Sequence, residues 1–149
     1  ALHNSGESFP EPACHPGTRT NFLSDLMKWA TDPNAKPVLW LCGTAGAGKS
    51  AIAQEFASKC STQGRLGASF FFRRGHAKRG TWDGLINTIA YQLAIGIPEF
   101  ALPLQQIIDS NRLIANRSIS LQFQDMLLKT FQHMPRTSFP LPIVVLDGL

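Results

Sequence analysis

Eight consecutive residues, Gly43-Thr44-Ala45-Gly46-Ala47-Gly48-Lys49-Ser50, restrict the fold of this chain more than any other feature. They match the pattern G-x-x-x-x-G-K-[ST] in full. The apolar residues 38–42 directly before them predict a short buried strand. Residues 51–59 after them combine good helix formers with apolar residues at helical spacing. A strand, a glycine-rich loop and a helix in this order are the setting in which the pattern binds phosphate.

Each residue type in this loop has a physical role. The glycines allow positive φ values, so that successive N–H groups turn inward around an anion. The following helix adds the positive end of its dipole, Lys49 can reach the β and γ phosphates, and the Ser50 hydroxyl can bind Mg²⁺. The small side chains between the glycines leave the loop open. The residues expected to bind nucleotide are Gly43, Thr44, Ala45, Gly46, Ala47, Gly48, Lys49, Ser50 and Ala51.

An acidic residue ends the last apolar run of the chain. Residues 143–146 are Ile-Val-Val-Leu and predict a buried strand, and Asp147 follows them. Ligands of open α/β sheets bind at the carboxyl ends of the strands. Asp147 is therefore expected to hold Mg²⁺ opposite Ser50, directly or through water. Taken alone the pattern is weak, because many strands end in Asp for reasons of turn geometry.

Composition bounds the class of protein. The 149 residues fit one domain or part of one, with 44% hydrophobic and 16% charged residues. No apolar run approaches the ~20 residues of a membrane-spanning helix, so no membrane partner is expected. The net charge of +4 suits phosphate binding but does not by itself indicate nucleic acid. Three cysteines without metal-ligand spacing (Cys14, Cys42 and Cys60) predict reduced thiols in a cytosolic or nuclear protein, and a cytoplasmic location is expected.

The rest of the chain alternates helices and strands. Residues 1–17 are rich in proline and glycine and are expected to form a linker or extended arm. Residues 67–72 predict a second buried strand. Helices are predicted from about residue 18 to Asp32-Pro33, from a cap at Thr81 to Gly96, over 99–110, and from a cap at Ser120 to a point before Pro135. The apolar face of the second of these helices is predicted to include Trp82, and Pro103 is expected to lie in the first turn of the third helix or to kink it.

Two further segments carry weaker hypotheses. The loop from Arg73 to Arg79 holds five basic or titratable groups in seven positions. It is interpreted as a solvated loop, with γ-phosphate sensing by Arg73 or Arg74, or a contact with a partner, as the functional alternatives. The segment 17–19, Gly-Thr-Arg, is either an ordinary helix N-terminus or a contact to the base or phosphate of a nucleotide.

Taken together, these motifs resemble the NACHT-type branch of the STAND P-loop NTPases, and within it the nephrocystin-3-like N-terminal domain common in fungal proteins. The resemblance begins at Cys14-His15-Pro16-Gly17-Thr18-Arg19 and continues through the loop. It also covers 67–74, 88–93 and 143–149, in the right order and spacing. It implies that residues 18–149 are the N-terminal part of a P-loop NTPase domain, a three-layer α/β/α fold on a parallel sheet.

The resemblance also carries expectations about function. It implies a signalling switch that binds ATP or GTP with Mg²⁺ and hydrolyses it slowly, with protein partners bound through flanking effector and repeat regions. It implies an Asp-Glu pair directly after Leu149, the Glu serving hydrolysis, so that catalytic residues stay unassigned here. It further implies two more parallel strands, one between 38–42 and the strand ending at Asp147. An unfilled place in the sheet would make this chain poorly soluble.

Two other functions stay open at this stage. A degenerate module that has kept the loop would bind partners in a way that Lys49→Ala does not affect. A small-molecule kinase would need an acceptor site and a lid with arginines, and residues 96–136 offer no convincing lid. Nucleic acid is not an expected partner, because Phe70, Phe71 and Phe72 are predicted to be buried rather than available for stacking.

Overall fold

The structure, a computed structural model, describes residues 20–72, 82, 84–135 and 141–148. Helices α1 (Thr20–Thr31) and α2 (Lys49–Thr62) precede strand β1 (Leu66–Phe71). After it come α3 (Leu85–Gly96), α4 (Pro98–Ser110), a short 3₁₀ turn η1 (Ile114–Asn116), a composite helix, and strand β2 (Ile143–Asp147). The described helices include none that is long and apolar enough to cross a membrane.

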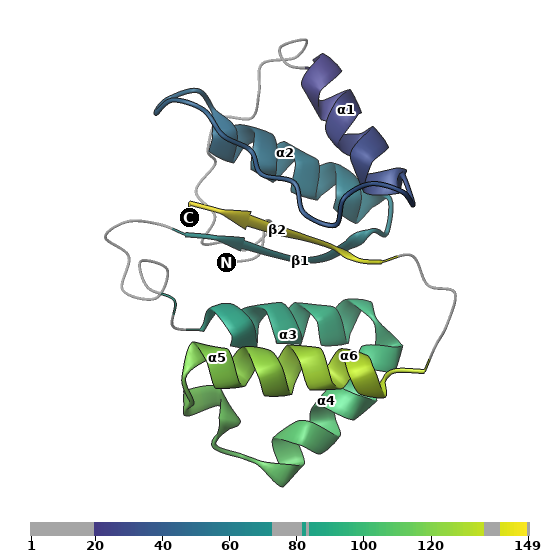
Figure 1. Cartoon of the computed structure of the whole chain (residues 1–149), viewed down its shortest axis with the longest axis vertical. Coiled ribbons are helices and arrows are strands. Elements are labelled where there is room, and N and C mark those ends of the chain that lie inside the picture. The colour runs from purple at the N-terminus through teal and green to yellow at the C-terminus, as the bar shows by residue number, and fades with distance from the viewer. Residues whose placement is uncertain (1–19, 73–81, 83, 136–140, 149) are drawn as a thin grey trace.

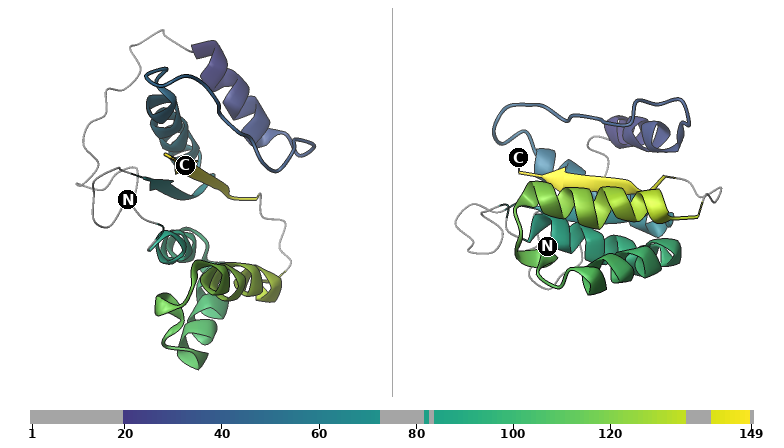
Figure 2. Two further views of the ribbon diagram at one scale, coloured as in Figure 1. Left: turned by 60° about the vertical axis from the view of Figure 1, so that its left-hand side comes forward. Right: turned by 60° about the horizontal axis from the view of Figure 1, so that its bottom comes forward.

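The two strands form a parallel pair with helices on both sides. Ser69 lies opposite Val145 and Phe71 opposite Asp147. Helices α1 and α2 lie on one side of the pair, and α3, α4 and the composite helix lie on the other (Figures 1 and 2). The predicted strands 67–72 and 143–146 are confirmed to within one residue. The fold is therefore α/β with a small parallel sheet.

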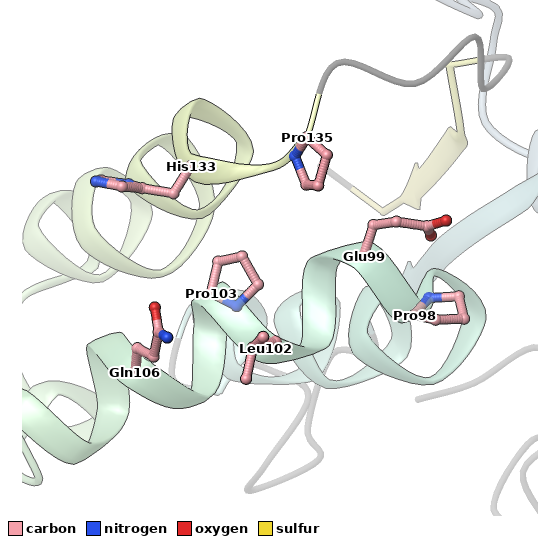
Figure 3. Close-up of a pocket in the computed structure, with 7 residues that line it drawn as sticks. All are labelled: Pro98, Glu99, Leu102, Pro103, Gln106, His133 and Pro135. Carbon is pink, nitrogen blue, oxygen red and sulfur yellow. The ribbon is translucent and has the colours of Figure 1, made fainter.

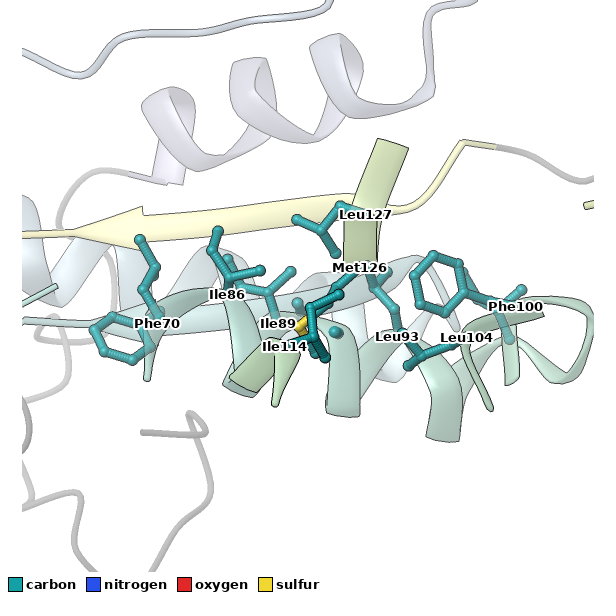
Figure 4. Packing of buried hydrophobic residues seen from close by; sticks show 13 residues of the cluster. Phe70, Ile86, Ile89, Leu93, Phe100, Leu104, Ile114, Met126 and Leu127 are labelled. Carbon is teal, nitrogen blue, oxygen red and sulfur yellow. The ribbon is translucent and has the colours of Figure 1, made fainter. Parts of the chain in front are cut away.

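Two apolar clusters hold these layers together. The larger one joins β1 to the helices beneath it and has Phe100, Leu93 and Ile114 at its centre, each almost fully buried (Figure 4). The smaller one packs α1 and α2 on the opposite side, through Phe56 and the fully buried Cys60, against Val145 of β2. Strand β1 is thus buried on both faces, whereas Val144 and Leu146 of β2 stay 42% and 39% exposed.

The strand predicted over residues 38–42 is wrong. These residues carry no strand pairing in the structure, and Val38 and Trp40 are 74% and 71% exposed. Only Leu41 of this segment packs against the smaller cluster. A strand exists through hydrogen bonds to a neighbouring strand, and β2 pairs with β1 alone among the described residues. An apolar run with no neighbour to pair with remains extended and unpaired.

Several predicted helix boundaries also need correction. Helix α3 begins at Leu85, so Trp82 lies before it and is half exposed, and Thr81 lies outside the described residues. Pro103 sits inside α4, beyond its first turn, and is buried there. The composite helix consists of α5 (Ile119–Gln122), a π-helical stretch η2 (Phe123–Lys129) and α6 (Thr130–His133). Its N-cap position is held by Ser118 rather than by Ser120.

Candidate functional site

The predicted phosphate loop lies between the extended segment 38–42 and the start of α2. Gly46 and Gly48 both have φ of 77°, the left-handed region that other residues avoid, and Gly48 stands directly before the helix. Gly43 has an ordinary backbone conformation, and a Cβ there would meet only normal contacts. Of the three glycines in the loop, Gly46 and Gly48 are therefore the positions whose backbone conformation requires glycine.

Lys49 folds back over the beginning of this loop. Its Nζ donates to the carbonyl oxygens of Gly43 and Thr44, at 2.9 Å each. A second turn within the loop is closed by the N–H of Ala47, which donates to the oxygen of Thr44 at 3.2 Å. An ammonium group has three donors, so these two bonds leave one for an added acceptor. The positive charge is thus held at the loop.

The N-terminus of α2 offers an electropositive end to the loop. The helix has 14 residues, no acidic residue in its first turn and no side chain that caps it. The first N–H groups of a helix have no partner within the helix, and the helix dipole makes this end positive. Ser50 and Ala51 supply two of these N–H groups. Loop, lysine and helix end together favour a bound anion with several oxygens.

Asp147 lies at the same end of the sheet as this loop. Both strands run toward the end of the molecule at which α2 begins, so the carboxyl ends of β1 and β2 and the start of α2 share one side (Figures 1 and 2). Side chains alternate along a strand, and Ile143 and Val145 face the cluster of α1 and α2. Asp147 is therefore on the face of β2 that α2 covers.

The oxygen donors at this end fit a magnesium ion that also binds phosphates. Ser50 offers a hydroxyl and Asp147 a carboxylate, and Mg²⁺ uses one or two protein oxygens together with phosphate oxygens and water. The described residues contain no group of three or more His, Cys, Asp or Glu that could hold a metal by themselves. Any Mg²⁺ here would thus depend on a bound phosphate ligand for its remaining oxygens.

The comparison with protein families decides where the chain belongs. The model of the family described as "Nephrocystin 3, N-terminal" matches residues 17–149, which is nearly the whole sequence. The chain belongs to the nephrocystin 3 N-terminal family. Neither the curated proteins nor the solved structures contain a match to it.

Three predicted segments of the chain lie outside the described residues. These are the linker or arm over residues 1–17, the segment 17–19 and the basic loop from Arg73 to Arg79. One residue at the site was not anticipated from sequence, namely Gly148, which follows Asp147 with φ of 88°. A glycine directly after the predicted metal-binding acid was the available signal.

The same domain has a separate concave surface between α4 and α6, on the other side of the sheet from α2 (Figures 1 and 3). It encloses about 430 Å³ and contains none of the predicted site residues. Three prolines and a leucine form most of its wall. It is lined by Pro98, Glu99, Leu102, Pro103, Gln106, His133 and Pro135.

Proposed function

We propose that this chain binds ATP or GTP as the nucleotide-binding part of a NACHT-type STAND P-loop NTPase, a switch with slow hydrolysis. The observation that carries the proposal is the conformation of the loop. Gly46 and Gly48 turn left-handed immediately before α2, and Lys49 returns to the carbonyl groups of Gly43 and Thr44. Together they place a fixed positive charge and the uncapped helix end at one point.

The chain's own residues would act as follows. The N–H groups of Lys49, Ser50 and Ala51 at the start of α2 would donate to the β and γ phosphate oxygens, and the Lys49 side chain would use its remaining donor on the same oxygens. Ser50 and Asp147 would hold Mg²⁺, which neutralises phosphate charge and orients the phosphates. None of the described residues is assigned as the group that activates water, so hydrolysis is proposed only for the protein that carries this domain.

The wider setting of the switch is part of the same proposal. A nucleotide-dependent change of conformation would pass to protein partners bound through flanking effector and repeat regions, in the cytoplasm. The free energy available for such a change equals the difference in nucleotide affinity between the two conformations. The family match over residues 17–149 supports an N-terminal domain of a multidomain protein as the setting.

The proposal is tested by equilibrium binding of fluorescent ATP and GTP analogues in the presence of Mg²⁺. Lys49→Ala should abolish binding, because it removes the charge at the loop. Lys59→Ala is the matched control. Lys59 lies on the same helix, its side chain is half exposed, and its Nζ is 4.0 Å from Oε1 of Glu55. Its affinity should equal that of the wild type.

Four results would contradict the proposal. Absence of nucleotide binding by the wild type would remove it altogether. Equal loss of binding in both lysine variants would indicate non-specific attraction to positive charge. If the wild type has no nucleotide affinity and Lys49→Ala still binds its protein partners, the degenerate interaction module would be favoured. If the chain transfers phosphate to a small acceptor, the small-molecule kinase would be favoured.

A further inference from the structure

One side of α4 forms a wall of the concave surface between α4 and α6, the α4–α6 groove. Glu99, Leu102, Pro103 and Gln106 line it from positions i, i+3, i+4 and i+7, which share one side of a helix. Glu99 and Gln106 stand at opposite ends of this row with Pro103 between them (Figure 3). The rise of the helix places the two ends about 10 Å apart. The groove therefore has an apolar middle and two polar ends.

The end at Glu99 offers two hydrogen-bond acceptors from a single residue. Among the residues that the structure describes, the Glu99 carboxylate has no ion pair or hydrogen bond. The backbone carbonyl of Glu99 lacks the helical hydrogen bond from position 103, because Pro103 lies inside α4 and proline has no N–H. A negative charge beside a carbonyl oxygen favours a cation with several N–H donors, which is the chemistry of an arginine or lysine side chain.

The middle of the α4–α6 groove suits apolar side chains on an extended chain. Leu102 is 67% exposed, so covering it removes apolar surface from water. Proline rings lose no side-chain entropy when they are covered, and the three prolines of the wall are therefore rigid before anything binds. Most of the lining residues lie at the surface of the molecule. An open groove of this kind fits a chain segment that continues past both ends.

We propose that the α4–α6 groove docks a short segment of a partner protein in which an arginine or lysine stands beside two apolar residues. The cation would bind the two acceptors of Glu99, and the apolar side chains would cover Leu102 and Pro103. The length of about 10 Å equals about three residues of extended chain. The groove lies on the other side of the sheet from α2, so this inference does not depend on the proposed nucleotide function (Figure 1).

Defined peptides test this surface on the whole 149-residue chain. The probes are tripeptides, acetylated and amidated at their ends, with arginine at the first or last position and leucine, phenylalanine or proline at the other two. Each has a partner peptide in which citrulline, a neutral side chain of the same shape, replaces arginine. Saturation-transfer NMR at low protein concentration measures the affinities. At least one arginine peptide should bind the wild type at millimolar concentration, about 10-fold more tightly than its citrulline partner.

Substitution of the acid separates charge recognition from apolar contact. Glu99→Gln should weaken the arginine peptide about 10-fold and leave the citrulline peptide unchanged. Asp109→Asn is the matched control, because it removes one negative charge from the same helix. Asp109 accepts from Nε2 of Gln105 at 3.1 Å on the exposed side of α4 and is not part of the groove. This variant should bind both peptides as the wild type does.

Leu102→Ser tests the apolar part of the α4–α6 groove. It should weaken the arginine and citrulline peptides by the same factor, because it removes apolar contact and leaves Glu99 in place. Thermal unfolding reports whether each variant is folded. If Glu99→Gln does not fold, the comparison of arginine with citrulline on the wild type still decides whether the groove recognises the cation.

Three results would overturn the inference. The first is a wild type that binds none of the arginine peptides. The second is equal affinity for the arginine and citrulline peptides, which would show a general apolar surface. The third is self-association of the chain that both Glu99→Gln and Leu102→Ser reduce in sedimentation velocity, since the occupant would then be a second copy. Lys49→Ala should keep the full peptide affinity, so a failure of the proposed nucleotide function leaves this inference standing.

Discussion

The side-chain amide of Gln92 takes the place of a neighbouring strand for Ser69. Its Oε1 accepts from the N–H of Ser69 and its Nε2 donates to the carbonyl oxygen of Ser69, at 2.9 Å each. Residues along a strand alternate in the direction of their backbone groups, and the N–H of Phe72 points to β2. The backbone N–H and carbonyl groups of Ser69, three residues earlier, therefore point away from β2. Gln92 of α3 provides their hydrogen-bond partners at the edge of β1 that faces away from β2.

The first prediction concerns this pair. Gln92→Ala should lower the free energy of unfolding by about 1–3 kcal/mol, because buried backbone groups of Ser69 lose their partner. Gln92→Glu should be at least as destabilising at neutral pH, since it removes the donor and buries a charge. Gln105→Ala is the control, because Gln105 bonds Asp109 on the exposed side of α4. Urea unfolding of the three variants makes the comparison, and equal stabilities would contradict the prediction.

The second prediction concerns Lys49 in the absence of nucleotide. Its bonds to Gly43 and Thr44 lie at an exposed loop, so Lys49→Ala should change the free energy of unfolding by about 1 kcal/mol or less. Amide hydrogen exchange over residues 43–48 should nevertheless become faster, because the loop loses two of its bonds. A large loss of global stability would contradict this prediction and would mean that the lysine is needed for folding.

The third prediction concerns pH. Burial raises the pKa of the Cys60 thiol from 9.0 to about 11, with the nearby charge of Arg65 opposing the shift. The folded state thus keeps the proton to higher pH than the unfolded state does. The stability that this provides is fully present below pH 9 and is lost as the pH rises from 9 to 11.

Unfolding measured below pH 9 and between pH 9 and 11 tests this third prediction. Cys60→Ala should lose part of the decline in stability over that interval, although its stability below pH 9 will also be lower because a buried group is removed. Cys42→Ala, which removes an exposed thiol, should follow the wild type. The same decline in all three proteins would assign it to other groups.

Local sequence patterns predicted the elements that are defined locally. The loop, the start of α2 and the strands ending at Phe71 and Asp147 follow from glycine spacing, the length of apolar runs and the acid that ends the last run. The N-cap at Ser118 was missed by two residues because Ser120 fits the same pattern. The resemblance to the nephrocystin 3 N-terminal family was likewise visible from motif order, and the match over residues 17–149 confirms that part of the assignment.

Features that depend on distant partners could not be read from the sequence. Residues 38–42 have the composition of a strand, but pairing decides whether a strand forms, and pairing is not encoded in the run itself. The bond between Gln92 and Ser69 joins positions 23 apart, and the bond from the N–H of Phe72 to the carbonyl oxygen of Asp147 spans still more of the chain. Such contacts become apparent only when the strands and α3 are placed in space.

The last prediction follows from the unpaired segment. Val38 and Trp40 are 74% and 71% exposed, and Val144 and Leu146 of β2 are partly exposed as well. Exposed apolar residues and unpaired strand edges promote association between chains. The 149-residue chain should therefore self-associate as its concentration rises, which sedimentation velocity can measure.

A pair of lysine substitutions locates the surface that causes this association. Trp40→Lys should reduce it, because the charge opposes burial of the segment 38–42 against another chain. Tyr91→Lys is the control, since Tyr91 is an aromatic residue of similar exposure (62%) on α3. Equal effects of the two substitutions would point to general hydrophobicity rather than to this segment. A monomeric wild type with a cooperative unfolding transition would contradict the prediction and show that the extended segment is stable in water without a neighbouring strand.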